Sequence, residues 1–561
     1  MAASINTVEA NGAVSRRGFM RLMATAGLAT GVAGLTGCAP QATADKKTDA
    51  NDLAETGSSW RDVPAPIDES LITDTQEADV IVVGGGLAGV STAASAVENG
   101  LTVIVLEKNE TPRMTGLDFG CVNSTLAKEA GLELSDEDIY KMTREWIHMS
   151  GNRARADIIL KFIRESGAAV DWIVEKAEAW GCRPVLAAMR SNSDMYFNYI
   201  HPVEFPDGPL YDLETASFGA NDIITMLQKQ VTDGGSQYLV QVAAEQLEKE
   251  GERVAAVIAK NADGDYVRFK GKKGVVLCTG DFGGDEAMMN ELTAYDFESF
   301  DPEGYFNASM STGDGHKMGL WAGGAFQMGP QPLMMLPQTY PYFYLHVNDR
   351  GERFCNEDCD SVNMCINQLQ QHEAKAWSIW DNKWREEIPA SLEVSGGMSW
   401  DQDFREMGTP WSAEVEEVGT HSWEADAGLL VTADTLDELA SAVGIPADAL
   451  KATVDRYNEL VEGGVDLDFG KRQELMTSIS EPPFYALRMQ TGMCVSVGGL
   501  NVDTNSQILD EAGAPIEGLY AVGNTAAGLF GVDYNEAPVP GVSLGRCVTF
   551  GKLLGEHLAS I

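Results

Sequence analysis

ADVIVVGGGLAG, residues 78–89, decides the fold of this chain. Its first six residues form an apolar, β-branched run that predicts a buried parallel strand. Glycines follow, and an alanine-rich segment through Val97 predicts a helix. A second apolar run, residues 101–106, predicts the next strand, which ends at Glu107. The order of strand, glycine turn, helix, strand and acidic residue predicts a Rossmann-like dinucleotide-binding unit.

Each position of this turn has an expected role. The first glycine permits a tight turn, the second lets the backbone approach a pyrophosphate, and the third lets helix and strand pack closely. The helix N-terminus offers unpaired N–H groups to the anion. The acidic residue, about 20 positions further on, accepts hydrogen bonds from ribose hydroxyls. The predicted first half of the site is therefore Gly84, Gly86, Leu87, Ala88, Gly89, Glu107 and Lys108.

Three later glycine motifs distinguish FAD from NAD, which share the first motif. VVLCTGDFGG (residues 275–284) and GLYAVGN (518–524) each predict a strand that ends in a glycine turn, and STGDG occupies residues 311–315. In this order the motifs resemble the FAD-binding subunits of the fumarate reductase and succinate dehydrogenase family, and the related 3-ketosteroid Δ1-dehydrogenases share them. The resemblance implies FAD, with the C-terminal segment closing over the isoalloxazine ring. It adds Thr279, Gly280, Asp314, Gly523, Asn524, Ser543 and Leu544 to the predicted cofactor site.

The resemblance covers residues 78–561 and implies the domain organisation. We expect an α/β fold in which residues 78–323 and 490–561 form a Rossmann-like FAD-binding domain with a parallel sheet. Residues 324–489 would form an α+β capping domain over the substrate. Within it, residues 437–462 predict a pair of helices.

The N-terminus predicts export. SRRGFMR (residues 15–21) has a twin-arginine signature, and a short apolar stretch follows it. LTGC (residues 35–38) resembles a bacterial lipobox, which makes Cys38 the lipidated N-terminus after removal of residues 1–37. Residues 38–77, rich in Ala, Asp, Thr and Ser, predict a flexible tether. We therefore expect a lipid-anchored protein on the extracytoplasmic face of the membrane; the alternative is a cytoplasmic protein with a chance arginine pair.

Composition restricts the possible partners. The chain has 561 residues, 44% of them apolar, and a formal net charge of −44. This length and apolar content suit a multidomain enzyme, and the charge argues against nucleic acid or anionic lipid as a direct partner. The sequence has neither a C-x-x-C-H haem motif nor a second nucleotide fingerprint. Electrons are therefore expected to pass through a separate partner, for which the resemblance suggests a multihaem c-type cytochrome.

Three clustered cysteines raise the alternative of a metal or iron–sulfur site. Cys355, Cys359 and Cys365 lie close in sequence, but their spacing matches no common ligand pattern. A fourth ligand would have to come from elsewhere in the chain. We expect no metal.

The charged residues with which fumarate reductases hold a dicarboxylate are not found at the matching positions. In the family an acid arginine lies eight residues after the arginine of a G-K-R-F-type motif, which is GERF (residues 351–354) here. The position of that acid holds a serine, the two relay positions proline and tyrosine, the histidine position valine, and the last arginine position tyrosine or proline. These residues are Ser361, Pro337, Tyr340, Val495, and Tyr534 or Pro538. Fumarate is therefore not the expected substrate.

A second resemblance supplies candidate catalytic groups. Tyr534, Pro540-Gly541 and the TFG of residues 549–551 resemble the Y-P-G and T-F-G segments of 3-ketosteroid dehydrogenases, although an insertion separates the tyrosine from the Pro-Gly pair. The resemblance implies that Tyr534 and the Gly541 N–H hold a substrate carbonyl. Tyr340 is a second candidate proton donor, and Arg546 could offset the high pKa of a tyrosine or bind a substrate oxygen. The alternative interpretation of Tyr534 is an ordinary loop residue.

Met-rich and Tyr-rich residues 328–344 suit the roof of a pocket for a bulky apolar or aromatic ligand, or ordinary cap core. Tyr196, Tyr199 and His201 could line its entrance, or lie in a surface loop. We expect a FAD-dependent oxidoreductase that reduces an activated C=C bond of an apolar, aromatic or enone/enoate-type small molecule, with electrons from a membrane quinol. The alternatives are a ketosteroid-type dehydrogenase running the reverse reaction and a non-catalytic flavoprotein electron-transfer module.

Overall fold

The computed structural model describes most of the chain after the predicted signal peptide. The described residues are 59–112, 116, 118–187, 190–191, 202–210, 219–339, 343–397, 413, 416–534 and 538–561. Within these ranges we find no helix with the length and apolar character needed to span a membrane. The predictions for residues 1–37 and Cys38, for the first part of the tether, and for Tyr196, Tyr199, His201 and Tyr340 fall outside the described residues.

The largest sheet has eight strands, and its central strands are parallel. β1 (Ile72–Val83) pairs in parallel with β2 (Val103–Leu106) on one side and with β9 (Tyr266–Leu277) on the other. β6 (Gln237–Leu239) continues the parallel sheet beyond β2, and β19 (Pro515–Ala521) continues it beyond β9. The carboxyl ends of these strands therefore meet at one edge of the sheet. The predicted Rossmann-like parallel sheet is confirmed.

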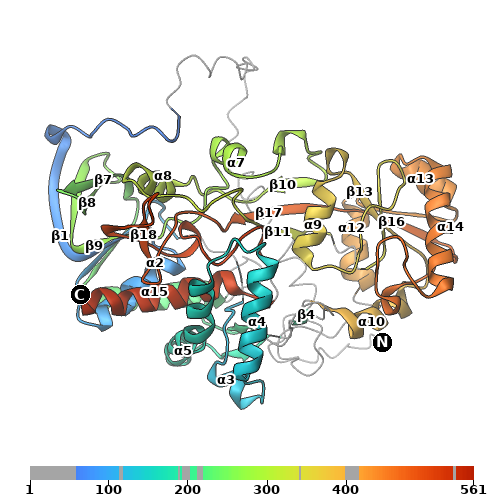
Figure 1. Ribbon diagram of the computed structural model, residues 1–561, viewed down its shortest axis with the longest axis horizontal. Helices are drawn as coiled ribbons and strands as arrows, with labels where there is room; N and C mark the ends of the chain where they lie inside the picture. The colour runs from blue at the N-terminus through green and yellow to red at the C-terminus, as the bar shows by residue number, and fades with distance from the viewer. Residues whose placement is uncertain are drawn as a thin grey trace, which may run out of the picture.

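Alternate residues of β1 point to two different layers, as expected for a strand buried on both faces. Val80 and Val82 pack against a helical layer, whereas Ile81 and Val83 pack against the layer on the other face. The helical layer is seen below the sheet in Figure 1, and α8, β7 and β8 lie above it. The helical layer comprises α2 (Leu87–Glu98), α5 (Ala156–Trp180), α6 (Gly219–Asp233) and α15 (Val542–Ser560); the second layer comprises β7 (Ala243–Glu250), β8 (Arg253–Lys260) and α8 (Asp314–Trp321).

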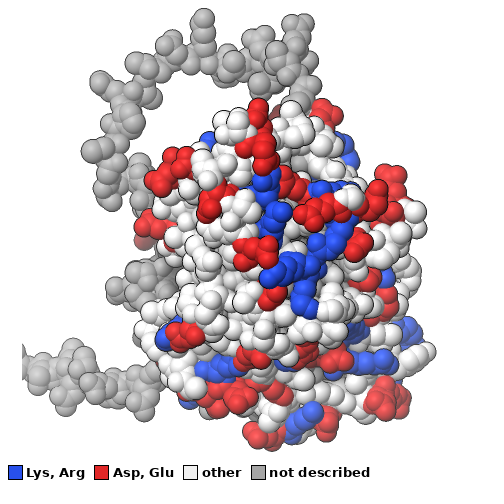
Figure 2. Space-filling model, turned by 90° about the vertical axis from the view of Figure 1, so that its left-hand side faces the viewer, with Lys and Arg blue, Asp and Glu red and all other residues white. Residues whose placement is uncertain are grey.

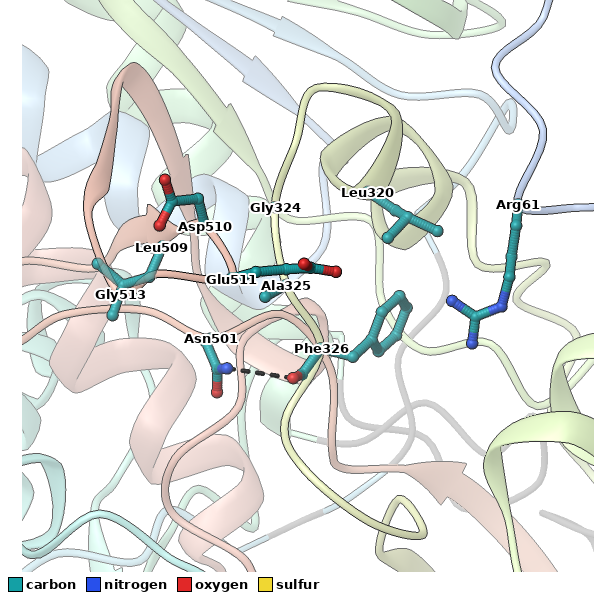
Figure 3. A pocket seen from close by; sticks show the side chains of 10 residues that line it. All are labelled: Arg61, Leu320, Gly324, Ala325, Phe326, Asn501, Leu509, Asp510, Glu511 and Gly513. Carbon is teal, nitrogen blue, oxygen red and sulfur yellow. Dashed lines mark hydrogen bonds between the residues drawn. The ribbon is translucent and has the colours of Figure 1, made fainter.

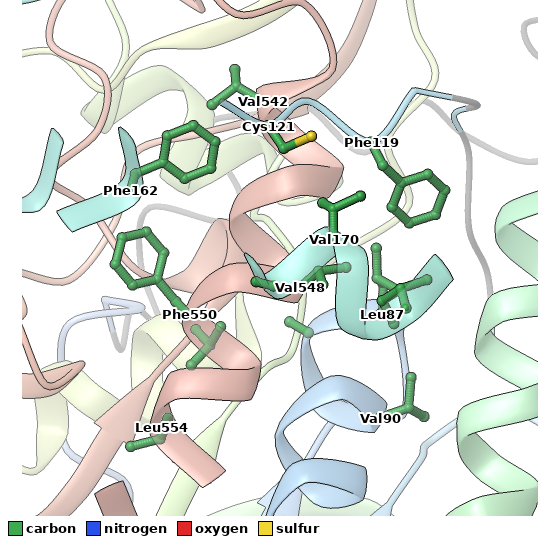
Figure 4. Packing of buried hydrophobic residues seen from close by; sticks show 14 of the residues in the cluster. Leu87, Val90, Phe119, Cys121, Phe162, Val170, Val542, Val548, Phe550 and Leu554 are labelled. Carbon is green, nitrogen blue, oxygen red and sulfur yellow. The ribbon is translucent and has the colours of Figure 1, made fainter. Parts of the chain in front are cut away.

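The C-terminal helix α15 lies in the middle of the helical layer. Figure 4 shows Phe550 and Leu554 of α15 beside Phe162 of α5, with Leu87 and Val90 of α2 on the neighbouring helix. Phe550 is 9% exposed and Leu554 1% exposed. Burial of each such side chain contributes about 1.5–3 kcal/mol relative to an exposed one. This packing fixes the last segment of the chain against the helix that follows the glycine turn.

The cap is built on an antiparallel sheet of four strands in the order β12, β13, β16, β15. Helices α13 (Leu436–Val443) and α14 (Ala447–Gly463) pack on this sheet in a separate apolar core. They confirm the predicted helical pair. The strands are β12 (Leu345–Asn348), β13 (Ala376–Trp380), β16 (Phe484–Arg488) and β15 (Leu430–Ala433).

A small sheet connects the cap to the FAD-binding part. β17 (Thr491–Ser496) lies between β10 (Tyr305–Asn307) and β11 (Leu333–Pro337), parallel to the first and antiparallel to the second. β11 falls within the range 324–489 that we assigned to the cap. Its partner β17 nevertheless belongs to the returning segment 490–561, so the separate cap sheet begins only with β12.

The tether predicted for residues 38–77 extends too far. Trp60 donates from Nε1 to Glu291 at 2.6 Å, and its backbone carbonyl accepts from Trp321 Nε1 at 3.1 Å. The Trp60 ring also packs edge-on against Phe326, with ring centroids 5.9 Å apart. β1 begins at Ile72, earlier than its apolar run suggests. These contacts attach residues 59–77 to the folded body, because an aromatic anchor and strand pairing outweigh their polar composition.

The remaining elements connect these layers. They are η1 (Glu69–Leu71), α3 (Thr125–Glu129), α4 (Asp136–Met149), β3 (Val185–Leu186), β4 (Arg190–Ser191), β5 (Val203–Glu204), α7 (Glu286–Leu292), η2 (Phe297–Ser299), α9 (Ser361–Leu369), η3 (His372–Ala374), α10 (Trp384–Ser395), β14 (Gly396–Gly397), η4 (Glu416–His421), α12 (Ser422–Asp426), η5 (Gln473–Leu475), β18 (Gln507–Leu509) and η6 (Gly523–Thr525).

The surface of the molecule carries acidic and basic groups side by side. Figure 2 shows a band of Lys and Arg on the end of the molecule that lies at the left of Figure 1, with Asp and Glu around it. Arg268 of β9 is held by Glu248 at 2.6 Å and by Glu69 at 2.5 Å. Lys272 pairs with Glu77 at 3.1 Å. Arg268 and Lys272 of β9 are therefore paired with carboxylates and are not free basic groups.

Candidate active site

The glycine turn after β1 has the geometry that a bound pyrophosphate requires. Gly84 has φ +102°, and a Cβ atom there would lie 2.2 Å from the carbonyl oxygen of Cys278. A Cβ atom at Gly89 would lie 1.9 Å from the Gly84 carbonyl oxygen. Gly86 caps α2 without a side-chain hydrogen bond, and a Cβ atom there would meet nothing within 4 Å. The N–H groups of the first turn, at Leu87 and Ala88, therefore begin beside open space, which suits an anion.

Gly85, which the sequence reasoning did not single out, is equally constrained. A Cβ atom at Gly85 would lie 2.1 Å from the Tyr238 hydroxyl, which donates to the Gly85 carbonyl at 2.9 Å. The Gly85 N–H donates to Glu107 at 2.9 Å. The run of three consecutive glycines, with Gly85 in the middle, was the available signal. The tyrosine that excludes a side chain there comes from β6, far along the chain.

Glu107 and Lys108 extend the site from the end of β2. Glu107 is 6% exposed and also accepts from the Asn109 backbone N–H at 2.8 Å, so its carboxylate holds the turn together. Lys108 pairs with Asp314 at 2.9 Å at the start of α8. Burial opposes ionisation of Asp314, but the Lys108 ammonium lowers the pKa of this carboxyl below its usual value. The structure thus brings three predicted cofactor residues together; contact of Glu107 with a ribose stays a prediction.

The ends of β9 and β19 complete the same edge. Thr279 Oγ1 accepts from the Gly315 N–H at 3.0 Å, and Thr525 Oγ1 donates to the Gly280 carbonyl at 3.0 Å. A Cβ atom at Gly523 would lie 2.9 Å from Ala88 Cβ, so the third glycine turn contacts the first helix. Turns that are distant in sequence therefore meet around the N-terminus of α2. The donor groups and the space beside Gly86 fit FAD.

The first turn of α15 is fixed against residues 118–120. Gly541, the N-cap of α15, has φ +73°, and its carbonyl accepts from the Gly120 N–H at 2.9 Å. A Cβ atom at Gly541 would lie 2.6 Å from the Asp118 carbonyl oxygen. Leu544, in the same turn of the helix, lies against Gly116, where a Cβ atom would be 3.2 Å from Leu544 Cδ1.

The Ser543 N–H in this turn donates to the Tyr534 hydroxyl at 3.3 Å. Tyr534 is 2% exposed and packs against Phe530, with ring centroids 5.1 Å apart. It is therefore a buried residue beside the helix terminus, not a surface loop residue. The roles predicted for Tyr534 and Gly541 toward a substrate carbonyl stay predictions.

Arg546 is a buried cation on the same helix. Its Nη2 donates to Asn524 Oδ1 at 2.5 Å and its Nη1 to the Val497 carbonyl at 3.2 Å, while the guanidinium lies 4.9 Å from the centroid of the Phe530 ring. No carboxylate among the described residues forms an ion pair with it, and its Nε has no hydrogen-bond partner there. Burial lowers the pKa of Arg546 to about 10, so the group is still cationic at neutral pH. A buried cation without a carboxylate favours an electron-rich ligand atom beside it.

The positions where the resembling family carries its substrate-binding charges are apolar or neutral here. Val495 lies in β17, and Ser361 is the first residue of α9. Tyr534 and Val362 are buried in the same apolar cluster, and Met334 of β11, Ile366 of α9 and Val495 pack against it. Pro337 ends β11 opposite Thr491, and Tyr340 lies outside the described residues.

His316 was missed by the sequence reasoning, although it directly follows the Asp314-Gly315 pair. It is fully buried, with its ring stacked on Phe326 at 5.9 Å and edge-on to Phe282 at 5.3 Å. Neither ring nitrogen has a hydrogen-bond partner among the described residues. Burial lowers the pKa of His316 to about 4, so the ring is neutral near pH 7.

The cysteine cluster is not assembled as a ligand set. Cys355 is buried with its Sγ 3.8 Å from His346 Nδ1, and Cys365 packs in an apolar cluster with Leu369. Over the part of the chain that the structure describes, no three His, Cys, Asp or Glu side chains are placed to hold a metal ion.

A surface hollow of about 360 Å³ lies away from these residues. Figure 3 shows Arg61 and Phe326 on one side of the hollow, and Asp510 and Glu511 on the other. Asn501 donates to the Phe326 carbonyl at 3.1 Å at its base. None of the residues predicted for the cofactor or the substrate lines this hollow. We therefore do not assign it as the active site.

The parallel sheet with its converging glycine turns, and the buried cation beside them, define a FAD-dependent oxidoreductase. The chain belongs to the FAD binding domain family, whose model matches residues 79–537. A vinyl phenol reductase of Lactiplantibacillus plantarum is 26% identical in an alignment of 517 residues that covers 86% of this chain and 96% of that protein. A fumarate reductase (cytochrome) of Shewanella frigidimarina is 26% identical over 510 residues, covering 86% of this chain and 77% of that protein.

The fold is shared with a solved steroid enzyme. The 3-ketosteroid-Δ4-(5α)-dehydrogenase from Rhodococcus jostii RHA1 superposes with a TM-score of 0.65 at 22% identity, covering 88% of this chain and 99% of that chain. This similarity confirms the predicted α/β architecture of a FAD-binding domain with an inserted cap. FAD is the cofactor that the family and the glycine turns specify.

Proposed function

We propose that this protein reduces an activated C=C bond of an apolar, aromatic or enone/enoate-type small molecule. The observation that carries the proposal is the loss of the dicarboxylate-binding charges. Val495 occupies one of those positions, Tyr534 or Pro538 another, and Ser361 a further one. Val495 packs against the apolar cluster that contains Tyr534. A small dianion would leave its charges uncompensated against these side chains. Fumarate is therefore not the substrate we propose.

The reaction needs a hydride, a proton and a group that holds developing negative charge. Bound FAD, when reduced, supplies the hydride to one carbon of the double bond. We assign Arg546 to the oxygen of the electron-withdrawing group, since this buried cation has no paired carboxylate in the described part of the chain. Tyr534, held at the helix terminus by the Ser543 N–H, orients the same oxygen. The Gly541 N–H and Tyr340 are further candidates from the sequence.

One similarity supports an aromatic substrate. The vinyl phenol reductase of Lactiplantibacillus plantarum matches this chain over 96% of its own length, and the substrate in its name is an aromatic alkene. Met334 and Ile366 pack against the apolar cluster that contains Tyr534, and they are part of the apolar surface that such a ligand requires. We propose the same chemical class, a conjugated alkene on a bulky apolar body, for this chain.

The electron source is part of the same proposal. The Shewanella frigidimarina relative is named a fumarate reductase (cytochrome). The present chain lacks a C-x-x-C-H motif, so we propose that a separate multihaem cytochrome brings electrons from a membrane quinol. Export by the twin-arginine route and a lipid anchor at Cys38 would place the enzyme beside such a partner, and residues 15–21 and 35–38 support this location.

A second candidate is the reverse reaction, the dehydrogenation of a saturated ketone. The fold shared with the ketosteroid enzyme and the tyrosine beside the Pro540-Gly541 turn favour it. A non-catalytic electron-transfer module is the third possibility, because the family's acid position holds Ser361.

A single experiment separates these functions. The purified FAD-loaded protein is reduced with dithionite and mixed under anaerobic conditions with vinyl phenols, enones, enoates, urocanate-like acids and fumarate. We expect an aromatic or enone-type alkene to restore the oxidised flavin spectrum, and fumarate to fail. Re-oxidation by fumarate alone would overturn the proposed substrate class. Bleaching of the oxidised flavin by saturated ketones, without re-oxidation by any alkene, would favour the dehydrogenase. No response to any compound would leave the electron-transfer module.

A further inference from the structure

Two acidic side chains from distant segments meet beside the first turn of α15. Phe119 and Val203 form an antiparallel bridge, with N–H···O distances of 2.9 and 3.1 Å in the two directions. Asp118 precedes the first of these residues and Glu204 follows the second, which puts the two carboxyl groups opposite each other. Their side chains are hydrogen-bonded to one another.

The environment of this Asp118–Glu204 pair contains little that could stabilise two negative charges. Glu204 is 5% exposed. Asp118 Oδ1 and Glu204 Oε2 have no hydrogen-bond partner among the described residues. Burial and the neighbouring Asp118 carboxyl group raise the pKa of Glu204. No cation among the described residues lowers the pKa of either acid. Two carboxylates in contact under these conditions share a proton, because the doubly ionised pair is too costly.

Glu204 is the protonated partner. Burial raises the pKa of Glu204 well above its usual value, and the Asp118 charge raises it further. Burial also raises the pKa of Asp118, while the hydrogen bond from Glu204 lowers it. The Glu204 O–H therefore donates to the Asp118 carboxylate. The two groups titrate as a coupled unit, and the raised pKa of Glu204 favours a proton shared between them.

Asp118 of this pair contacts the N-terminus of α15. A Cβ atom at Gly541 would lie 2.6 Å from Asp118 Cβ, so the side chain of Asp118 packs directly on the N-cap of α15. The first turn of the helix, directly after this N-cap, carries the Ser543 N–H that donates to the Tyr534 hydroxyl at 3.3 Å. The Asp118–Glu204 pair, the N-terminus of α15 and Tyr534 therefore lie next to one another in one small region.

We propose that the Asp118–Glu204 pair supplies the proton that completes reduction of the double bond. This inference rests on the proposed reductase function. In each turnover the substrate gains a hydride on one carbon and a proton on the other. The proton passes from the Glu204 carboxyl group to the second carbon of the substrate, and a proton from solvent replaces it, so the pair keeps a single negative charge. The electron pair arrives with the hydride, so the acids change only their protonation.

The pair acts through its shared proton, and the test therefore measures that proton directly as well as the reaction. Infrared spectra of the FAD-loaded protein in H₂O and D₂O report the C=O stretch of a protonated carboxyl group at neutral pH. We expect this band in the wild-type protein and its loss in Glu204→Gln. In Asp118→Asn, burial still raises the pKa of Glu204, so the band should remain but shift in frequency because its hydrogen-bond acceptor has changed. The matched control is Asp222→Asn. Asp222 is also fully buried with a pKa raised by burial, but accepts from Trp180 Nε1 at 3.0 Å in the α6 region.

The second readout is the pH profile of re-oxidation of the reduced protein by the alkene found above. We expect the wild-type and Asp222→Asn rates to fall as pH rises through the upper pKa of the pair. Glu204→Gln, which cannot release a proton, should be slower by about 100-fold or more and lose that pH dependence. An unchanged pH profile in both Glu204→Gln and Asp118→Asn would overturn the proposal, and so would a carboxyl band that is the same in Glu204→Gln as in the wild-type protein.

The two readouts also separate this inference from the proposed function. If no alkene re-oxidises the protein, the reductase function fails, and the infrared spectra still decide whether the pair holds a proton. If an alkene reacts and neither variant alters the profile, the reductase stands and the pair is not its proton source. Retained FAD absorbance and thermal midpoint in Glu204→Gln, the closer isostere, establish that the variant is folded.

Discussion

The FAD-binding edge and the substrate-binding side of this site are constructed in different ways. At the edge, backbone geometry decides what fits, since Gly84 and Gly89 leave no space for a Cβ atom against neighbouring carbonyl oxygens. On the side that we propose binds the substrate, side-chain chemistry decides, with Val495, Tyr534 and Arg546 giving an apolar surface and one cation. Backbone constraints preserve a sequence motif across substrates, whereas side chains can change with each substrate. The edge therefore identifies the cofactor, and the other side limits the substrate.

The largest effect is expected where the backbone constraint is strictest. Gly84→Ala puts a Cβ atom 2.2 Å from the Cys278 carbonyl oxygen in a residue with φ +102°, so the turn has to move. We expect loss of FAD binding and a fall in unfolding free energy of about 3 kcal/mol or more. Urea unfolding and FAD titration measure the two effects.

Gly86→Ala is the matched control for this substitution. Gly86 has φ −71°, and its Cβ atom would meet nothing within 4 Å. We expect nearly unchanged stability of the apoprotein and weaker FAD binding, because the methyl group would enter the space assigned to the pyrophosphate. Equal losses of stability in both variants would contradict the distinction between a backbone clash and a binding surface.

The next effect concerns the buried cation of the substrate side. Arg546→Met should lower kcat/KM for the alkene by about 100-fold, the size found when one electrostatic stabiliser is removed from an active site. Arg456→Met, which removes an exposed arginine paired with Asp468 at 2.7 Å, serves as the control. Steady-state kinetics with both variants measure the difference. Full activity of Arg546→Met would remove Arg546 from the proposed mechanism.

The sequence predicted one of these two regions far better than the other. Gly84, Gly86 and Gly89 were predictable because their roles follow from a strand, a turn and a helix that are continuous in sequence. The Asp118–Glu204 pair was not, since its members lie 86 positions apart and only the Phe119–Val203 bridge brings them together.

Two other differences have similar causes. His316 was missed because burial, not a motif, determines its state. The tether was drawn too long because composition did not reveal that Trp60 anchors on Glu291 and Trp321. Local backbone patterns were thus visible in the sequence, while long-range side-chain contacts were not.

A smaller effect is expected at Tyr534. Tyr534→Phe keeps the buried ring against Phe530 and removes the hydroxyl that accepts from Ser543 at 3.3 Å. We expect a loss of stability of about 0.5–1.5 kcal/mol and a reduction in turnover of about 10-fold. Tyr238→Phe removes the hydroxyl that binds Gly85 at the cofactor edge and should affect FAD affinity instead. Wild-type turnover by Tyr534→Phe would exclude Tyr534 as proton donor or carbonyl ligand.

The smallest effect at any single pH is expected in the unfolding free energy of Glu204→Gln. It appears as a change in the slope of the unfolding free energy against pH. The folded protein holds the Glu204 proton to higher pH than the unfolded chain does, because burial and Asp118 raise the pKa of Glu204. This contribution is complete below the usual glutamate pKa and is lost as pH rises through the pKa of the folded state. The wild-type unfolding free energy should therefore decline with pH over this interval, and Gln, which does not titrate, should reduce the decline. Urea midpoints at several pH values test this, with Glu511→Gln on the surface as a control whose slope should match the wild type. Parallel curves for Glu204→Gln and the wild-type protein would mean that folding does not raise the pKa of Glu204. The Asp118–Glu204 pair would then not hold the shared proton that we propose.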